Sequence, residues 1–206
     1  PDYSSAASDV YKRQGIDCEI INHDKSEHKE KIAAENNQET FGNLSSLLKC
    51  FEVAKKDQSD LIYFVEDDYL HYEHSLVDML NTYERVSSQH KDEIIVCPSD
   101  YPFNYMNNEK TNILIGSQQH WRTITKMLCT FMISKKMFQK HIDNFEKTCE
   151  KRHEPFEKYL NKILESEIGI SPIKSLAIHM TNVNSSYGLS PFIDIKKLWE
   201  ENKIDQ

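Results

Sequence analysis

Three consecutive acidic residues, Glu66, Asp67 and Asp68, directly follow the apolar run Leu61–Val65. In an open α/β sheet ligands bind outside the carboxyl ends of the strands, which is where these acids would lie. Adjacent carboxylates repel one another, and a divalent cation such as Mg²⁺ or Mn²⁺, which prefers oxygen ligands, relieves that repulsion. In extended backbone Glu66 and Asp68 face the same side while Asp67 points elsewhere. The pattern predicts a metal site at Glu66 and Asp68, with helix capping by one of the acids as the alternative.

Two other segments carry side chains suited to binding a substrate. In His120-Trp121-Arg122, the indole offers a flat face for a sugar ring and the guanidinium a fork for phosphate or carboxylate. The alternative is a surface loop whose tryptophan packs on the core. Asp100 and Tyr101 follow an apolar strand at the same expected sheet edge and could bind an acceptor, although a proline-shaped turn explains them equally well.

Composition narrows the function classes. The chain has 206 residues, enough for one domain, and 38% of them are hydrophobic, which argues against disorder. Its net charge of -8 argues against general nucleic-acid binding. No apolar run approaches the ~18 residues of a membrane span, and no signal-peptide pattern is present. Five scattered cysteines without a CxxC pair indicate reduced thiols and a cytoplasmic protein.

Residue patterning predicts the elements that position these side chains. We expect a foreign or disordered leader over residues 1–14, one domain over 15–189, and a tail over 190–206 with a short helix near 195–202. Strands alternate with amphipathic helices, which predicts an α/β sandwich with a mainly parallel sheet. The expected strands are 16–21, 61–65, 94–97, 113–115, 127–133 and one within 170–179. The expected helices begin at Gly42-Asn43, cover 76–86, cover 137–145 with Ser134 as cap, and cover 156–164.

From Gly15 onward the chain resembles the GT-A glycosyltransferases, particularly the family 2-like group. The resemblance is carried by CEIINHDKS (18–26), FGNLSSLLKCFEVAKK (41–56) and LIYFVEDDY (61–69). These segments match the family's order of a strand with an acidic loop, an amphipathic helix, and a strand bearing a DxD-type metal motif. Glu66 in place of the first aspartate is a departure from that motif. Downstream, HEPFEKYLNKILESEIGISPIKSLAIH (153–179) matches a base acid, a helix and a strand ending in histidine.

The resemblance implies a GT-A, Rossmann-like enzyme that transfers a sugar, with inversion, from a nucleoside-diphosphate sugar to an acceptor hydroxyl. It implies surface-glycan synthesis on a glycan or lipid-linked acceptor, peripheral association with the inner face of the membrane, and a missing first βα unit. By this likeness Glu154 is the catalytic base, and Glu66, Asp68 and His179 bind Mn²⁺ or Mg²⁺. For an enzyme of this kind we expect Asn22, Asp24, Asn43 and Asp67 to bind the nucleotide sugar. We expect acceptor or diphosphate binding, on the side-chain chemistry described above, from Asp100, Tyr101, His120, Trp121 and Arg122.

Three of these assignments have plainer interpretations. Glu154 could favour a helix N-terminus electrostatically, His179 could be a buried structural histidine, and Asp24 could be an ordinary turn residue. A nucleotidyltransferase or metal-dependent phosphohydrolase would also place acids after a strand, although the chain has no glycine-rich phosphate loop. A sugar- or partner-binding remnant without turnover is the non-enzymatic alternative.

Overall fold

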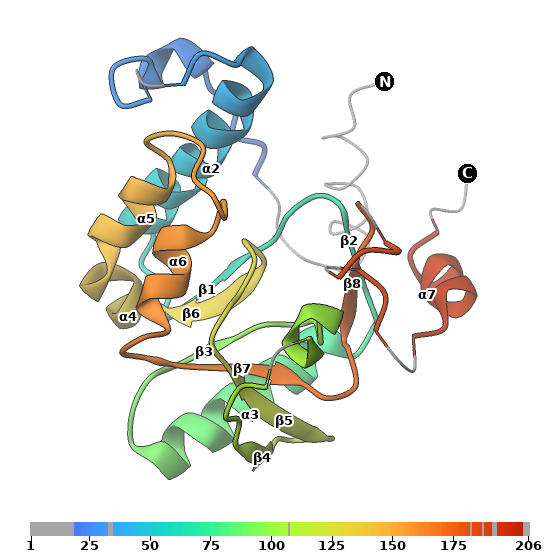
Figure 1. The fold of residues 1–206 in the computed structure, drawn as a ribbon. Helices are drawn as coiled ribbons and strands as arrows, with labels where there is room; N and C mark the ends of the chain where they lie inside the picture. The colour runs from blue at the N-terminus through green and yellow to red at the C-terminus, as the bar shows by residue number, and fades with distance from the viewer. Residues whose placement is uncertain are drawn as a thin grey trace.

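The computed structural model describes residues 19–32, 35–106, 108–181, 183–186, 188–190 and 193–203. A six-stranded sheet lies between helices on its two faces, and a separate two-stranded sheet lies beside it (Figure 1). The helices on one face are α2 (Gln38–Lys56), α4 (Lys135–Lys140), α5 (Ile142–Thr148) and α6 (Lys158–Ile163). The other face is covered by α3 (Ser75–His90). The α/β class is therefore as predicted.

Strand direction differs from the prediction of a mainly parallel sheet. The strand order is β1 (Leu61–Phe64), β6 (Phe131–Ser134), β3 (Ile94–Val96), β7 (Ile168–Pro172), β5 (His120–Ile124) and β4 (Ile113–Ile115). Only β3 and β7 pair in parallel, and the other four neighbouring pairs are antiparallel. The sheet is mixed because β6 runs against both β1 and β3, and the β4–β5 hairpin adds antiparallel strands beyond β7.

Two apolar cores hold the layers together. On the α2 side, Phe51 packs edge-on against Phe64 of β1, with ring centroids 5.2 Å apart. On the α3 side, Met79 and the fully buried Trp121 pack against β3 and β7. Burying large side chains on both faces of the sheet contributes most of the driving force for this layered arrangement.

Helix α2 begins earlier than its apolar pattern predicts. Asn37 caps it, because its side chain accepts a hydrogen bond from the backbone N–H of Thr40 at 3.0 Å. Asn43, expected to cap this helix, instead lies exposed inside it. Ser134 does cap α4 as predicted, accepting from the Met137 N–H at 3.1 Å. The single helix expected over 137–145 is divided at His141 into α4 and α5.

The short second sheet pairs two distant segments. Strand β2 (Tyr69–His71) runs antiparallel to β8 (Ala177–His179), so the one strand predicted within 170–179 is in fact two, β7 and β8. Helix α7 (Ile195–Glu201) packs against β2, burying Leu198, and it lies where the short terminal helix was expected. The remaining short elements are the 3₁₀ helices η1 (Lys25–His28) and η2 (Pro102–Tyr105).

Four sequence predictions concern the N-terminal strand, the leader, the cysteines and membrane crossing. Of the strand expected over 16–21, the described residues 19–21 are not in a strand, and Ile20 and Ile21 are exposed. The leader over 1–14 lies outside the described residues. The four described cysteines are free thiols, while Cys18 falls outside the described ranges. Within those ranges, every helix is too short or too polar to cross a membrane.

Candidate functional site

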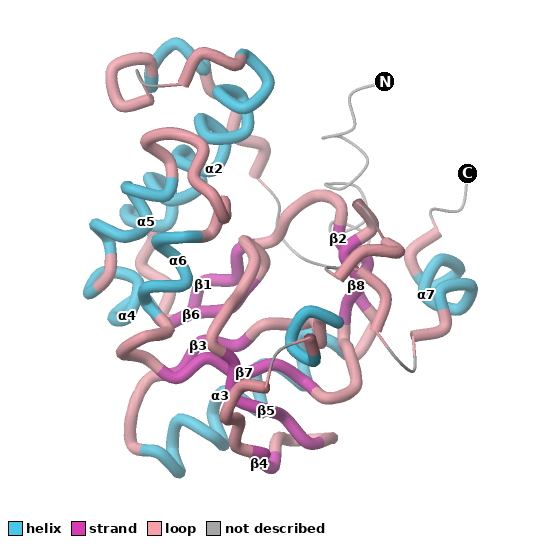
Figure 2. The backbone as a smooth tube through the Cα atoms, viewed as in Figure 1, coloured by secondary structure: helices cyan, strands magenta, loops and turns pink. Residues whose placement is uncertain are grey.

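The three acids occupy the short loop between β1 and β2, which Figure 2 draws in pink between two magenta strands. Strand β8 fixes this loop, because Tyr69 lies opposite His179 in the β2–β8 register and the Met180 N–H donates to the Asp68 carbonyl at 2.8 Å. As a result, Asp68 Oδ2 and His179 Nε2 lie 2.8 Å apart. Two side chains 111 positions apart in the sequence thus meet at one end of the sheet.

Asp68 and His179 favour each other's charged forms. Burial opposes ionisation of Asp68, but hydrogen bonds with His179 and Thr181 and the imidazole charge outweigh it and hold the Asp68 pKa below its ordinary value. The hydrogen bond with Asp68 raises the pKa of His179, and the charges of Asp68, Glu66 and Glu157 act in the same direction, while burial opposes them. The pair therefore has the character of a partly buried ion pair.

Glu66 is held by Thr130, the residue that directly precedes strand β6. The Thr130 hydroxyl accepts a hydrogen bond from the Glu66 N–H at 3.0 Å and donates one to Glu66 Oε2 at 3.2 Å. Burial is the main cause that raises the pKa of Glu66 to about 7, and the negative charge of Asp68 adds to it. The carboxyl of Glu66 is therefore poorly compensated when it is ionised.

A further glutamate, Glu157, belongs to this set of charges. It lies at the start of α6, and burial raises its pKa, while the charge of His179 lowers it and that of Glu154 raises it. Its charge also acts on Glu66. Glu154, the predicted base, is exposed in the segment leading into α6. The structure thus brings Glu66, Asp68, Glu157 and His179 into one electrostatically coupled group.

Aromatic side chains connect this group to the segment after β3. The ring of Tyr69 lies 5.0 Å from that of His179, and its hydroxyl bonds the Tyr101 hydroxyl at 2.6 Å. Tyr101 is almost fully buried and stacks on Phe103, with ring centroids 5.3 Å apart. Tyr101 therefore packs beside the acidic group, with its hydroxyl bonded to Tyr69, and its expected contact with an acceptor stays a prediction.

Of the four residues predicted to contact the nucleotide, Asp67 shares the loop with this group, and the other three come from the segment before η1 and from α2. Asp67 is exposed in the acidic loop, and Asn22 is exposed before η1. The Asp24 carboxylate caps η1 by accepting from the Ser26 N–H at 2.8 Å, as the turn interpretation expected. Asn43 is exposed on α2. In the described ranges none of the four forms a hydrogen bond with Glu66, Asp68 or His179.

The segment His120–Arg122 divides its residues between the two faces of β5. Trp121 is fully buried against α3, so its ring is closed to any ligand, which corrects the prediction that it stacks on a sugar. Gly116 packs so closely on it that an added Cβ would lie 2.2 Å from two atoms of the indole. His120 is exposed, whereas Arg122 faces away from Trp121 and is 8% exposed.

Arg122 and Asp100 form a second polar cluster, under η2. Arg122 donates to the Asn104 carbonyl at 3.1 Å, and its guanidinium carbon lies 4.6 Å from the centre of the Tyr105 ring. The Tyr105 hydroxyl donates to Asp100 Oδ2. Burial raises the pKa of Asp100 to about 6, against the effects of that hydrogen bond and of the Arg122 charge.

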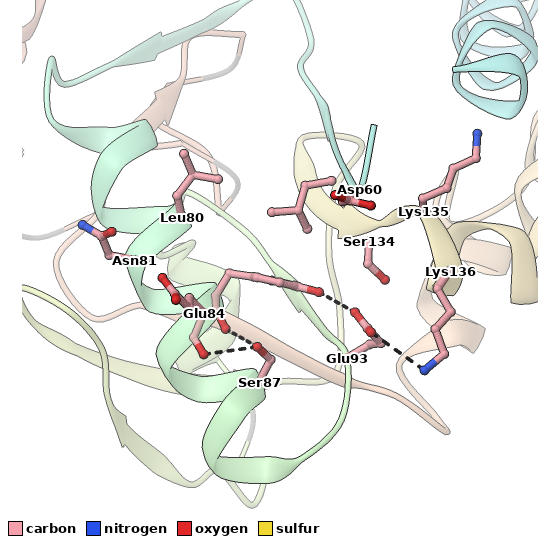
Figure 3. A pocket seen from close by; sticks show the side chains of 11 residues that line it. Asp60, Leu80, Asn81, Glu84, Ser87, Glu93, Ser134, Lys135 and Lys136 are labelled. Atoms are coloured by element: carbon pink, nitrogen blue, oxygen red, sulfur yellow. Dashed lines mark hydrogen bonds and ion pairs between the residues drawn. The ribbon is translucent and has the colours of Figure 1, made fainter. Parts of the chain in front are cut away.

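A cleft of about 510 Å³ lies at the opposite end of β1 from the acidic loop. Leu61, Leu80 and Tyr83 line it, and Glu93 bridges Tyr83 and Lys136 across it (Figure 3). Because Leu61 begins the strand that the acids follow, the length of β1 separates this cleft from the coupled charges. Among the described residues that line it, only Lys136 and Glu93 form an ion pair, and none of the residues expected to act on a substrate lines it, so we assign the chemistry to the acidic loop and not to this cleft.

The side chains at the acidic loop have the chemistry of a divalent cation site without its closed geometry. Two carboxylates and an imidazole suit Mn²⁺. Burial, and after it the charge of Asp68, raises the pKa of Glu66, and a cation at this loop would stabilise its ionised form. His179 Nδ1 is buried and has no hydrogen-bond partner in the described structure. No three His, Cys, Asp or Glu side chains of the described residues converge closely enough to enclose an ion. Binding would require the Asp68–His179 hydrogen bond to open.

Sequence reasoning missed Glu157 and Thr181 as members of the site and did not place Thr130 in it. Glu157 lies three residues after Glu154, and this spacing at a helix start was the available signal for it. Thr181 follows the strand-end histidine by two residues, and only the β2–β8 pairing shows that it reaches Asp68. Compared with known proteins, the chain matches no family model and no curated sequence.

Proposed function

We propose that this protein is a metal-dependent glycosyltransferase that moves a sugar from a nucleoside-diphosphate sugar to an acceptor hydroxyl. The observation that carries the proposal is the contact of Asp68 with His179, coupled to Glu66 and Glu157 at one end of the sheet. A cluster of carboxylates joined by one imidazole is suited to holding a cation against a diphosphate. The resemblance of the motifs to family 2-like GT-A enzymes supports the same activity.

Glu66, Asp68 and His179 would hold Mn²⁺ or Mg²⁺, which supplies positive charge to the departing diphosphate. The protein's part is to orient these ligands. Thr130 fixes Glu66, while the β2–β8 register fixes Asp68 and His179 at the same end of the sheet. These hydrogen bonds keep the three side chains at one end of the sheet, and the bond between Asp68 and His179 would open when the cation binds.

Transfer also needs a base for the acceptor. The acceptor oxygen forms a bond to the anomeric carbon while the bond from that carbon to the diphosphate breaks, its electron pair leaving with the diphosphate. The acceptor proton passes to a carboxylate. We assign this carboxylate to Glu154, as the motif predicts, and name Glu157 as the second candidate because it is the one coupled to His179.

The proposal is tested by measuring release of UDP, GDP or CDP from the matching sugar donors in the presence of Mn²⁺ and an acceptor mixture. Glu154→Gln and Glu157→Gln are compared with Asp143→Asn, an exposed carboxylate on α5, as the matched control. Loss of the base should lower turnover by about 10²- to 10⁴-fold with donor binding intact. Unchanged turnover in both glutamine variants contradicts a base in this segment.

The same assay separates the competing functions. A phosphohydrolase would cleave the donor without forming a glycoside, and a nucleotidyltransferase would release pyrophosphate from a nucleoside triphosphate and a sugar phosphate. A non-catalytic remnant would bind the donor while release stayed at background. Synthesis of a surface glycan at the inner face of the membrane remains part of the proposal, to be tested on lipid-linked acceptors.

A further inference from the structure

Four polar atoms come together beneath η2 without hydrogen-bond partners. They are Asp100 Oδ1, Asn104 Nδ2, Arg122 Nε and Ser171 Oγ, and each is buried and unpartnered within the described structure. Arg122 and Ser171 are direct neighbours across the β5–β7 register, and Asp100 joins them through Tyr105, whose ring lies against the Arg122 guanidinium. Asp100, Arg122 and Ser171 are at least nine-tenths buried.

Such a cluster is unusual, because buried polar groups in folded proteins nearly always have a partner. These side chains come from β5, β7, η2 and the segment after β3, so no single local distortion explains all four. The unpaired set contains a carboxylate oxygen that accepts, two nitrogens that donate, and a hydroxyl that can do either. These four atoms, called the polar floor below, are therefore hydrogen-bonding groups that have no partner in the described part of the surrounding protein.

A short segment covers this cluster of polar atoms. It consists of the single 3₁₀ turn η2, followed by the highly exposed Met106, and Tyr105 within it is 56% exposed. Its attachments include the Tyr105–Asp100 and Arg122–Asn104 hydrogen bonds and the bond from the Phe103 N–H to the Ser186 carbonyl at 2.9 Å. An outward movement of this turn would open the polar floor to solvent.

The opposite charges of Asp100 and Arg122 in the polar floor favour a neutral ligand over an anion. Asp100 and Arg122 have opposite charges but form no ion pair with each other, since the Asp100 carboxylate bonds Tyr105 and the guanidinium bonds a carbonyl. An anion such as a diphosphate would satisfy Arg122 and be repelled by Asp100. Neutral hydroxyl groups both donate and accept, so adjacent hydroxyls of one ring can satisfy both sides. The exposed Tyr105 adds an aromatic face of the kind that packs against sugars.

We propose that Asp100, Arg122 and Ser171 form a binding subsite for the hydroxyl groups of a neutral sugar, reached by displacement of η2. This inference rests on the proposed function, in which the sugar is part of the acceptor. Asp100 and Arg122 were expected to bind either the acceptor or the diphosphate, and in this proposal they bind the acceptor. Tyr101 links it to the coupled charges through its bond with Tyr69.

The test is saturation-transfer NMR titration of the full chain with methyl glycosides of glucose, galactose, mannose and N-acetylglucosamine, without nucleotide or metal. At least one glycoside should bind. Ser171→Ala should weaken its binding about tenfold, because it deletes a ligand hydrogen bond while breaking none in the free protein. Asp100→Asn should weaken it at least as much, and Ser46→Ala, an exposed serine of α2, should not.

Absence of binding by all four glycosides overturns the proposal, as does unchanged affinity in Ser171→Ala. Competition of inorganic pyrophosphate with a bound glycoside would overturn it in favour of a diphosphate site. Failure of the proposed function is distinguishable, because it would abolish Mn²⁺-dependent UDP binding while the glycoside affinities of wild type and Ser171→Ala still differed.

Discussion

Replacing Glu66 with glutamine should stabilise the metal-free protein, and by more at high pH than at low pH. The folded-state pKa of Glu66 is about 7, above the ordinary 4.5, so the folded state holds this proton more tightly than the unfolded chain does. Stability therefore falls as pH rises from about 4.5 to 7. Glutamine resembles the protonated acid and can still accept from Thr130.

The magnitude follows from the two pKa values. At 1.36 kcal/mol per pH unit, the raised pKa of Glu66 lowers the stability of the fold by about 3 kcal/mol at pH 8.5 and by about 1 kcal/mol at pH 5. Glu66→Gln should therefore gain about 2 kcal/mol relative to wild type between these two pH values. Added Mn²⁺ should reduce the stability difference between Glu66→Gln and wild type at pH 8.5. A ligand that binds the folded state stabilises it, and the variant lacks one of the proposed cation ligands.

The assay is urea denaturation in EDTA at both pH values, with Glu165→Gln, an exposed glutamate after α6, as the control. The control should show the same stability difference from wild type at pH 5 and pH 8.5. If the stability of Glu66→Gln depends on pH as that of the control does, the ionised Glu66 carboxylate is not poorly compensated in the fold. The electrostatic argument for a cation at this loop would then fail.

Two further predictions concern the scaffold. Gly116→Ala should destabilise the fold by about 1–3 kcal/mol, because the added Cβ would lie 2.2 Å from the buried Trp121 ring; an unchanged urea midpoint contradicts that packing. Glu167→Gln should cost about 1–2 kcal/mol at pH 7, since the nearly buried carboxylate bonds Lys140 at 2.7 Å and His141 at 2.6 Å. Although burial opposes it, these bonds lower the Glu167 pKa below 4.5. This contribution is therefore present above pH 4.5 and is lost as pH falls through the folded pKa; a cost that does not shrink as the pH is lowered below 4.5 contradicts the assignment.

The sequence was most informative where a pattern had one structural solution. The apolar run 61–65 predicts a strand, and β1 covers Leu61–Phe64 of it. Its burial was overestimated, because β1 is an edge strand of the sheet, only Phe64 in it is buried, and Val65 is 40% exposed. The period of the apolar residues in 76–86 likewise predicted α3, which extends over Ser75–His90. Strand direction was not available from such patterns, because a strand buried on both faces has the same apolar composition whether its neighbours are parallel or antiparallel.

The part of the candidate site whose residues are neighbours in the sequence could be predicted. The part that depends on pairing between distant segments could not. The acids after β1 are evident from the sequence, whereas the contact of Asp68 with His179 depends on the three-residue strands β2 and β8. Trp121 lies among polar residues that suggest a surface loop, yet alternation along β5 turns it into the core. Glu157 joins the site only because the start of α6 packs near His179.

The most direct test of the central claim is calorimetric titration of UDP into the protein with Mn²⁺ and, separately, with EDTA. Wild type should bind UDP only with Mn²⁺, and Asp68→Asn should lose that binding, because it removes a proposed cation ligand and the partner of His179. Asp143→Asn should bind UDP as wild type does. Equal UDP affinity of wild type and Asp68→Asn in Mn²⁺, or of wild type in Mn²⁺ and EDTA, would contradict a cation-dependent nucleotide site at this loop.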